Sequence, residues 1–60
     1  MQYYDGQIVQ VGDVFVQGYF GHCIVNKIDE DVHAVNIQTG EKFQVTDFQM
    51  EESDLLRRKA

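Results

Sequence analysis

The sequence has few of the features that mark secreted, membrane or nucleic-acid-binding proteins, and cysteine is the first of these. Its 60 residues include a single cysteine, Cys23, so no internal disulfide can form. Small secreted domains usually depend on several disulfides because their cores are thin. The cysteine content therefore predicts a reducing compartment, and we expect the protein to be cytoplasmic.

Long apolar runs are also missing. The longest uninterrupted runs, such as residues 14–16 and 23–25, are far shorter than the roughly 20 apolar residues that a membrane-spanning helix needs. The first five residues do not contain a basic region followed by an apolar segment. We therefore expect neither a signal peptide nor a membrane association.

Basic residues are scarce. The chain has five Lys and Arg residues and ten Asp and Glu residues, which gives a formal net charge of -5. Contacts with phosphates need clustered Lys and Arg, so this balance argues against direct binding of nucleic acid. The one basic cluster, Arg57, Arg58 and Lys59, is interpreted as charge compensation at the C-terminal end of a helix.

The sequence also lacks a recognisable catalytic, metal or nucleotide site. His22, Cys23 and His33 are the soft metal ligands other than methionine, and a structural zinc site usually needs four. Cys23 lies within an expected strand of an acidic protein, so it is interpreted as a small buried hydrophobe rather than as a nucleophile with His33 as base. Gly18 and Gly21 do not form a nucleotide-binding glycine pattern. We expect no enzyme activity, no catalytic residue, no metal and no cofactor.

Short β-type runs separated by turn signals fill residues 7–45. A chain of 60 residues holds one domain, and four or five twisted strands in so short a chain would close on themselves. The predicted fold class is therefore mainly β: a small SH3-like barrel of four to five antiparallel strands over residues 1–60. The expected strands cover residues 7–11, 14–16, 23–28, 33–37 and 43–45.

The alternation of residues predicts which side chains face the core. Val14 and Val16 are expected to face inward and Phe15 outward. Gly12–Asp13 precedes this strand as a tight turn or bulge. Residues 38–41 are predicted to form a hairpin turn in which Gly40 has a positive φ.

The later strands are assigned in the same way. Val35 and Ile37 are expected to face the core, opposite Phe43 and Val45. In the preceding strand, residues 23–28, the alternation of apolar residues is interrupted. A β-bulge at Asn26–Lys27 would restore it, because Val25 and Ile28 would then face the same side.

After Val45 the period of the sequence changes from that of a strand to that of a helix. Thr46 and Gln49 have the spacing of a capping box, and residues 47–60 contain no glycine or proline. The pattern predicts a helix over part of 47–58, either continuous or as one tight turn that restarts at Ser53. Four residues would lie on one face of this helix: Phe48, Glu52, Leu55 and Leu56.

Residues 12–48 resemble the small SH3-like barrels of the Tudor and KOW type. The matching features are a glycine turn before a valine strand, a glycine loop, two apolar residues three apart, an acidic turn and a last hairpin. They are Gly12-Asp13, the loop ending in Gly21, Val25 with Ile28, Asp29, and Thr39-Gly40-Glu41.

The resemblance implies two kinds of partner. Tudor barrels often bind methylated Lys or Arg in an aromatic cage by cation–π attraction. In this chain Tyr19 and Phe20 would form the cage walls, and His22 holds the position after the glycine loop that commonly carries Trp or Tyr. KOW barrels usually serve machinery associated with nucleic acids.

Two surfaces are candidates for partner binding. Tyr19 and Phe20, with Tyr3 and Tyr4, either form an exposed aromatic patch or cover a thin core. The acidic residues Asp29, Glu30 and Asp31, together with Glu51, Glu52 and Asp54, either present a negative binding surface or keep the protein solvated.

The leading hypothesis is a non-enzymatic module that binds a protein partner, including a phage-type inhibitor or an accessory factor of a nucleic-acid enzyme. Its candidate partner-binding residues are Tyr19, Phe20, His22, Asp29, Glu30 and Asp31. The alternatives are a KOW-like or Tudor-like domain and a self-assembling protein that pairs through a sheet edge or through Leu55 and Leu56.

Overall fold

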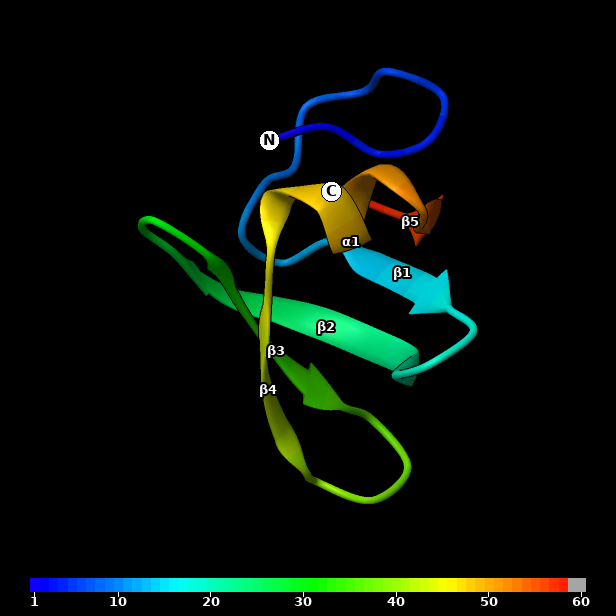
Figure 1. Ribbon diagram of the computed structural model, residues 1–60. Coiled ribbons are helices and arrows are strands. Elements are labelled where there is room, and N and C mark those ends of the chain that lie inside the picture. Colours follow the sequence, from blue (N-terminus) through cyan, green and yellow to red (C-terminus); the bar gives the residue numbers. More distant parts are fainter. Residues whose placement is uncertain (59–60) are drawn as a thin grey trace.

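The computed structural model describes residues 1–58 and shows five antiparallel strands and one short helix (Figure 1). The elements are β1 (Val14–Gln17), β2 (Gly21–Ile28), β3 (Val32–Asn36), β4 (Lys42–Val45), α1 (Asp47–Glu51) and β5 (Asp54–Arg57). The strands form one sheet in the order β4-β3-β2-β1-β5. The mainly β fold class is confirmed, but within the residues described the sheet has two ends and is not closed as a barrel.

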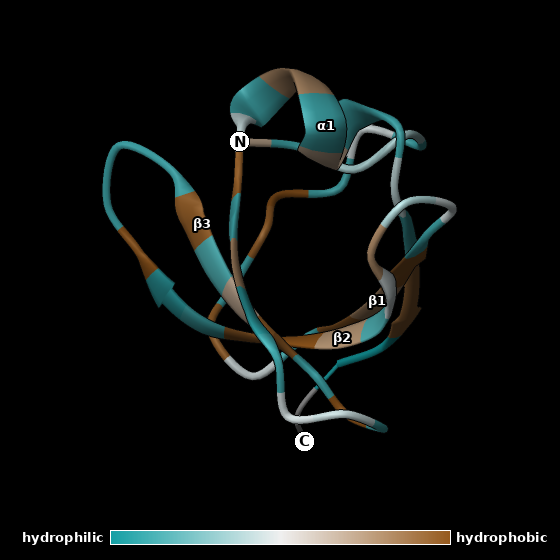
Figure 2. Ribbon diagram, turned by 60° about the horizontal axis from the view of Figure 1, so that its bottom comes forward, coloured by the Kyte–Doolittle hydropathy of each residue, from teal (hydrophilic) through white to brown (hydrophobic). Residues whose placement is uncertain are grey.

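Strand β2 is the centre of the sheet and its longest member, with eight residues. It pairs with β1 on one side and β3 on the other, and its curvature carries the sheet around the core (Figure 2). The predicted bulge is confirmed, because the register with β3 shifts between Val25 and Lys27. On either side of it, Val25 pairs with Ala34 and Ile28 pairs with Val32, so the apolar alternation is restored as expected.

Asn36 joins the two hairpin turns at one end of the sheet. Its side-chain amide donates to the carbonyl oxygen of Phe20 at 2.8 Å. Its side-chain oxygen accepts from the backbone N–H groups of Gln38 and Thr39 at 2.9 and 3.0 Å. Gly21 and Gly40 each have a φ of 76°, which confirms the positive φ expected at Gly40.

The predicted faces of β1 are wrong. Phe15 is fully buried in the core cluster, whereas Val14 and Val16 lie on the opposite face of the sheet. Both faces of this strand are apolar, so alternation alone does not show which face is the core. The larger Phe15 ring fills the core beside Tyr3, with the ring centroids 6.2 Å apart.

The predicted faces of β3 are also reversed. Val32 and Ala34 are the buried residues, and they pair with Val45 and Phe43 of β4. Phe43 and Val45 therefore face the core as predicted, but not opposite Val35 and Ile37. These two residues share a face, as expected, and that face is the outer one.

The N-terminal segment contributes to the core without forming the predicted strand over 7–11. A single isolated bridge joins Gln2 to Ile8, while Tyr3 and Val9 are buried in the core cluster. Tyr4 is 78% exposed, so the two adjacent tyrosines point in opposite directions. Figure 1 shows this segment beside α1, and the backbone N–H of Tyr4 donates to the carbonyl oxygen of Ser53 at 3.0 Å.

Helix α1 begins as predicted and ends early. The capping box is present: the Gln49 N–H donates to the Thr46 hydroxyl at 3.3 Å, and the Gln49 side-chain oxygen accepts from the Thr46 N–H at 3.0 Å. Met50 is its buried residue, whereas Phe48 is 69% exposed. The helix stops at Glu51, and no helix among residues 1–58 is long and apolar enough to cross a membrane.

The prediction of a helical face that includes Leu55 and Leu56 is wrong, because both lie in β5. Leu55 pairs with Phe15 and packs against the core, which favours an extended backbone over a second helical turn. The interpretation of Arg57, Arg58 and Lys59 as helix-end charges is also wrong for the first two. Arg57 belongs to β5, Arg58 contacts Asp13, and Lys59 lies outside the described residues.

Asp13 is a buried carboxylate that joins three distant segments of the chain. It is fully buried, and its oxygens accept hydrogen bonds from the Tyr3 hydroxyl at 2.8 Å and the Gln10 N–H at 2.9 Å. The Arg58 guanidinium donates to both of its oxygens at 3.1 and 3.2 Å, and to the carbonyl oxygen of Ile8 at 2.7 Å. This group of side chains, the Asp13 clamp, ties the N-terminal segment to the residue after β5.

The surroundings of Asp13 favour its ionised form. Burial by itself raises the pKa of this carboxyl, but the hydrogen bonds from Arg58, from the Gln10 N–H and from Tyr3 outweigh burial and leave the pKa below its usual range. Burial and the neighbouring Asp13 raise the pKa of the Tyr3 hydroxyl. The clamp is therefore a neutral phenol, a carboxylate and a guanidinium at neutral pH.

Asp13→Asn is expected to destabilise the fold by about 2–3 kcal/mol, because charge-assisted hydrogen bonds to a buried group are lost. The contribution of Asp13 is present above the pKa of an unfolded Asp, about 4, and is lost as the pH falls through the lower folded value. Urea unfolding between pH 7 and pH 2 should therefore show a weaker pH dependence for Asp13→Asn than for the wild type. Glu30→Gln, at an exposed turn position, is the charge-matched control, and equal effects of both variants would contradict the role of the clamp.

Gly21→Ala is expected to destabilise the protein by about 1–2 kcal/mol, because a left-handed backbone is costly for other residues. A Cβ there would also approach the Asn36 amide nitrogen to 3.1 Å. Gly18→Ala is the control, since Gly18 lacks a positive φ and its Cβ would meet open space. In thermal unfolding, Gly21→Ala should have the lower midpoint temperature of the two variants. A midpoint as high as that of Gly18→Ala would show that the backbone at position 21 does not require glycine.

Candidate functional site on the outer sheet face

The face of the sheet opposite the core, here called the outer face, carries an unusual number of apolar residues. Helix α1 and the N-terminal segment pack on the core side through Met50 and Tyr3. On the outer face Ile24 is 37% and Ile37 is 54% exposed, while Val14 is buried. The apolar side chains of this face are Val14, Val16, Ile24, Val35 and Ile37. Strands with apolar residues on both faces are typical of sheets that are covered on both sides.

One row of residues crosses all five strands of the outer face. Val14 pairs with Ile24 and Arg57, Ile24 pairs with Val35, and Val35 pairs with Lys42. In strand order this cross-sheet row runs Arg57, Val14, Ile24, Val35, Lys42. Its centre is aliphatic and both of its ends are basic. With neighbouring strands about 4.8 Å apart, the row is about 19 Å long.

The outer face also gathers the cations of an acidic protein. Lys27, Lys42 and Arg57 all belong to it, and the remaining basic side chain among residues 1–58, Arg58, is bound to Asp13. Asp54, which pairs with Val16, is the acidic residue on the strands of this face. Apart from the buried Asp13, the other acidic residues of the described part lie in the N-terminal segment, in turns and around α1: Asp5, Asp29, Glu30, Asp31, Glu41, Asp47, Glu51 and Glu52.

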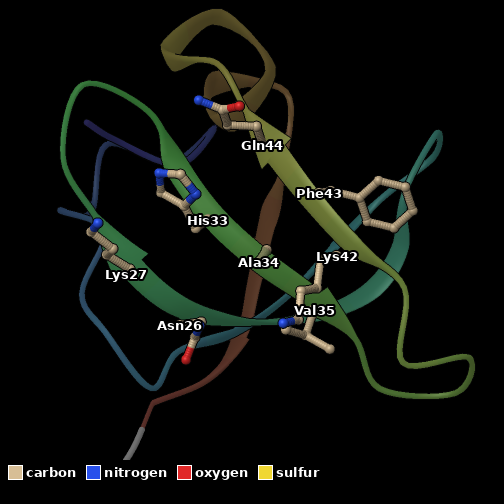
Figure 3. Close-up of a pocket in the computed structure, with 8 residues that line it drawn as sticks. All are labelled: Asn26, Lys27, His33, Ala34, Val35, Lys42, Phe43 and Gln44. Carbon is tan, nitrogen blue, oxygen red and sulfur yellow. The ribbon is translucent and has the colours of Figure 1, made fainter.

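A pocket of about 280 Å³ opens beside the Lys42 end of the cross-sheet row (Figure 3). Lys27, His33 and Gln44 form a second row across β2, β3 and β4 at its border. In Figure 3 the Phe43 ring points away from Lys27 and His33, in agreement with its contact to the core. The pocket is lined by Asn26, Lys27, His33, Ala34, Val35, Lys42, Phe43 and Gln44.

Carboxylates of the β2–β3 turn reach the border of this pocket. The oxygens of Asp29 lie 3.0 and 3.1 Å from Nε2 of His33 and 3.5 Å from Nζ of Lys27. The side-chain amide of Gln44 donates to Asp31 at 3.3 Å. The backbone N–H of Asp31 and the neighbouring His33 hold the pKa of Asp29 below its usual range. Lys42, by contrast, forms no ion pair within residues 1–58.

The structure separates the predicted partner-binding residues into two groups. Tyr19 and His22 lie at one end of β2, and Asp29, Glu30 and Asp31 follow its other end. Eight residues of extended chain place these ends about 23 Å apart. The two groups therefore do not form one site, although His22 belongs to the outer face and Asp29 lies beside the pocket.

The aromatic loop contains one exposed ring. Tyr19 is 81% exposed, whereas Phe20 is 6% exposed and belongs to the core, so of the two alternatives exposure holds for Tyr19 and core packing for Phe20. Phe20 packs edge-on against Tyr19 and tilted against Phe43, with centroids 4.9 Å apart in both pairs. The loop backbone is held by Gln17, whose side-chain oxygen accepts from the N–H groups of Tyr19 and Phe20.

The possible metal and nucleophile residues face different directions. Cys23 is fully buried in the core, where burial raises the pKa of its thiol, and its Sγ lies 3.6 Å from the carbonyl oxygen of Phe20. His22 and His33 are on the outer face and belong to different rows. Among the described residues no group of three His, Cys, Asp or Glu could hold a metal ion. Cys23 is therefore not placed to use His33 as a base.

Sequence reasoning missed the main residues of the outer face. It assigned Val35 and Ile37 to the core and did not name Ile24 or Lys42 as partner-binding residues. A usable signal was present, because β1 and β3 carry apolar residues on both faces. A thin sheet with one core needs such residues on one face only, so the surplus indicates a second contact surface.

Cys23 is expected to react with a thiol reagent at least about 100-fold more slowly in the native protein than in denaturant, because a core strand must open first. The measurement is the rate of absorbance change with an aromatic disulfide reagent, with and without urea. Equal rates in the two conditions would show that the thiol is accessible in the folded state.

Comparisons of the chain with protein-family models, with curated proteins and with solved structures found no match. Its function has to be inferred from its own residues and their geometry.

Proposed function

We propose that the protein is a non-enzymatic interaction module that binds an extended, acidic and apolar segment of a partner protein on its outer sheet face. The observation that carries this proposal is the cross-sheet row, which has aliphatic side chains at its centre and a cation at each end. Apolar burial would supply affinity, and the cations would fix the choice of partner.

The aliphatic centre of the row favours a protein ligand. Nucleic-acid sites without base-specific contacts use aromatic side chains as stacking platforms. The centre of this row is Val14, Ile24 and Val35 instead. Such side chains match the apolar residues of a peptide, whose alternate side chains point the same way when it is extended.

The charges at the ends of the row favour an acidic segment. The net charge of -5 repels anions at a distance, but that repulsion is screened beyond about 8 Å at physiological ionic strength. At contact range the partner meets Lys42 and Arg57. These cations also oppose face-to-face pairing of two copies of this chain, because like charges would meet.

The SH3-like relationship and the two functions that it implies are weaker proposals. The strand order with a short helix before β5 supports a relationship to SH3-like folds. A methyl-binding cage needs several accessible rings, and Tyr19 is the accessible ring of its loop. A role as an inhibitor or accessory factor of a nucleic-acid enzyme is compatible with an acidic-segment binder, and the identity of the partner decides it.

Selection of a random peptide library against the wild-type protein is expected to enrich extended peptides that carry aliphatic residues at every second position, with Asp or Glu next in the same alternation, so that both kinds of side chain point to the row. Ile24→Asp should weaken their binding by about tenfold or more, because it places a charge at the centre of the row. Phe48→Asp is the matched control, since it makes the same kind of change at an exposed position on α1.

The selection contradicts the proposal if the enriched peptides are basic, or if Ile24→Asp binds them as well as Phe48→Asp does. Two further measurements separate the alternatives. Salt-dependent binding of single-stranded oligonucleotides by the wild type, lost in Lys42→Gln, would favour the nucleic-acid function. Sedimentation that shows a dimer abolished by Ile24→Asp would favour self-assembly.

A further inference from the structure

We propose that the pocket between β2, β3 and β4 is an anion subsite for a carboxylate of the partner, and that Asp29 is a tethered competitor for it. This inference rests on the proposed function and adds where the acidic group of the partner binds. It also assigns to the β2–β3 turn a role in setting the affinity.

The pocket has the composition of a carboxylate site. Lys27, Lys42 and His33 supply nitrogen atoms from three strands, and Asn26 and Gln44 supply amides. Val35 belongs both to the pocket and to the cross-sheet row, so the two are continuous. A peptide that lies along the row can place one side chain on Val35 and the acidic side chain two residues away, which points the same way, beside Lys42.

Asp29 shows that Lys27 and His33 accept a carboxylate in this arrangement. Its oxygens already lie within 3.0–3.1 Å of His33 and its Oδ2 lies 3.5 Å from Lys27. Its attachment is short, because Asp29 lies next to Ile28, the last residue of β2, and four residues before His33. A tethered group of this kind acts as a ligand at high effective concentration.

Lys42 is the cation of the pocket that the turn leaves available, since it forms no ion pair among residues 1–58. A carboxylate from a partner would meet Lys42 first. It gains Lys27 and His33 only by displacing Asp29. The turn therefore lowers the affinity for acidic ligands and favours ligands that also make the apolar contacts of the row.

Asp29→Asn tests the competition directly. Asparagine keeps a side-chain oxygen that can accept from the Asp31 N–H, which donates to Asp29 at 3.1 Å, so the turn is retained. Glu30→Gln removes the same charge from the adjacent exposed position, whose side chain forms no ion pair within residues 1–58. A difference between the two variants therefore reports the local contact and not the net charge.

The probe is an acidic, apolar peptide selected on the wild type, titrated by fluorescence anisotropy. We expect Asp29→Asn to bind it about two- to fivefold more tightly than Glu30→Gln, the range typical of one exposed ion pair. Lys42→Gln should weaken binding by a similar factor. Replacing the acidic residues of the peptide by amides should remove the difference between the two turn variants.

The outcomes separate the two proposals. Binding that depends on Ile24 but is equal in Asp29→Asn and Glu30→Gln, and unchanged in Lys42→Gln, overturns the anion subsite and leaves the proposed function standing. If selection on both the wild type and Asp29→Asn enriches no acidic peptide, both proposals fall.

Discussion

The buried carboxylate of Asp13 is the interaction on which the rest of the structure depends. A domain of this size buries only about 60% of the surface that its unfolded chain exposes, so apolar burial leaves a small margin. Asp13 adds to the stability of the folded state, because it accepts hydrogen bonds from Tyr3, Gln10 and Arg58 at once. These contacts hold the N-terminal segment against the sheet and fix the end of β5 beside β1. They also hold the Arg58 guanidinium against Asp13, so that the cations on the outer face come from the strands alone.

The division of the apolar residues between two faces connects this fold to its proposed function. The core is completed by Tyr3, Val9 and Met50 from outside the sheet. The outer face is covered less completely by the described residues, because Val14 is buried while Ile24 is 37% and Ile37 is 54% exposed. Lys42 and Arg57 place positive charge at the two edges of this face. A partner segment with acidic and aliphatic residues would complete it as Tyr3 and Met50 complete the core.

The sequence predicted the elements that depend on local chemistry. Three such predictions are confirmed: the bulge at residues 26–27, the positive φ of Gly40 and the capping box of Thr46 and Gln49. They could be predicted because each depends on residues a few positions apart. The faces of β1 and β3 were predicted wrongly, because both faces are apolar and the choice is made by distant partners such as Tyr3. The strand β5 was missed for the same reason: Leu55 is extended because it pairs with Phe15, forty residues earlier in the chain. The cross-sheet row combines five strands, so it became visible only once their register was known.

The most direct measurement of the central claim is a map of backbone amide chemical shifts while a selected acidic, apolar peptide is added. If the outer face is the binding surface, the largest changes should follow the cross-sheet row and the pocket, in β2 around Ile24 and in β3 and β4 around Val35 and Lys42. The amides of α1 and of the Tyr19 loop should change little. Changes concentrated on Tyr19 or Phe48, with Ile24 and Val35 unaffected, would contradict the assignment of the binding surface.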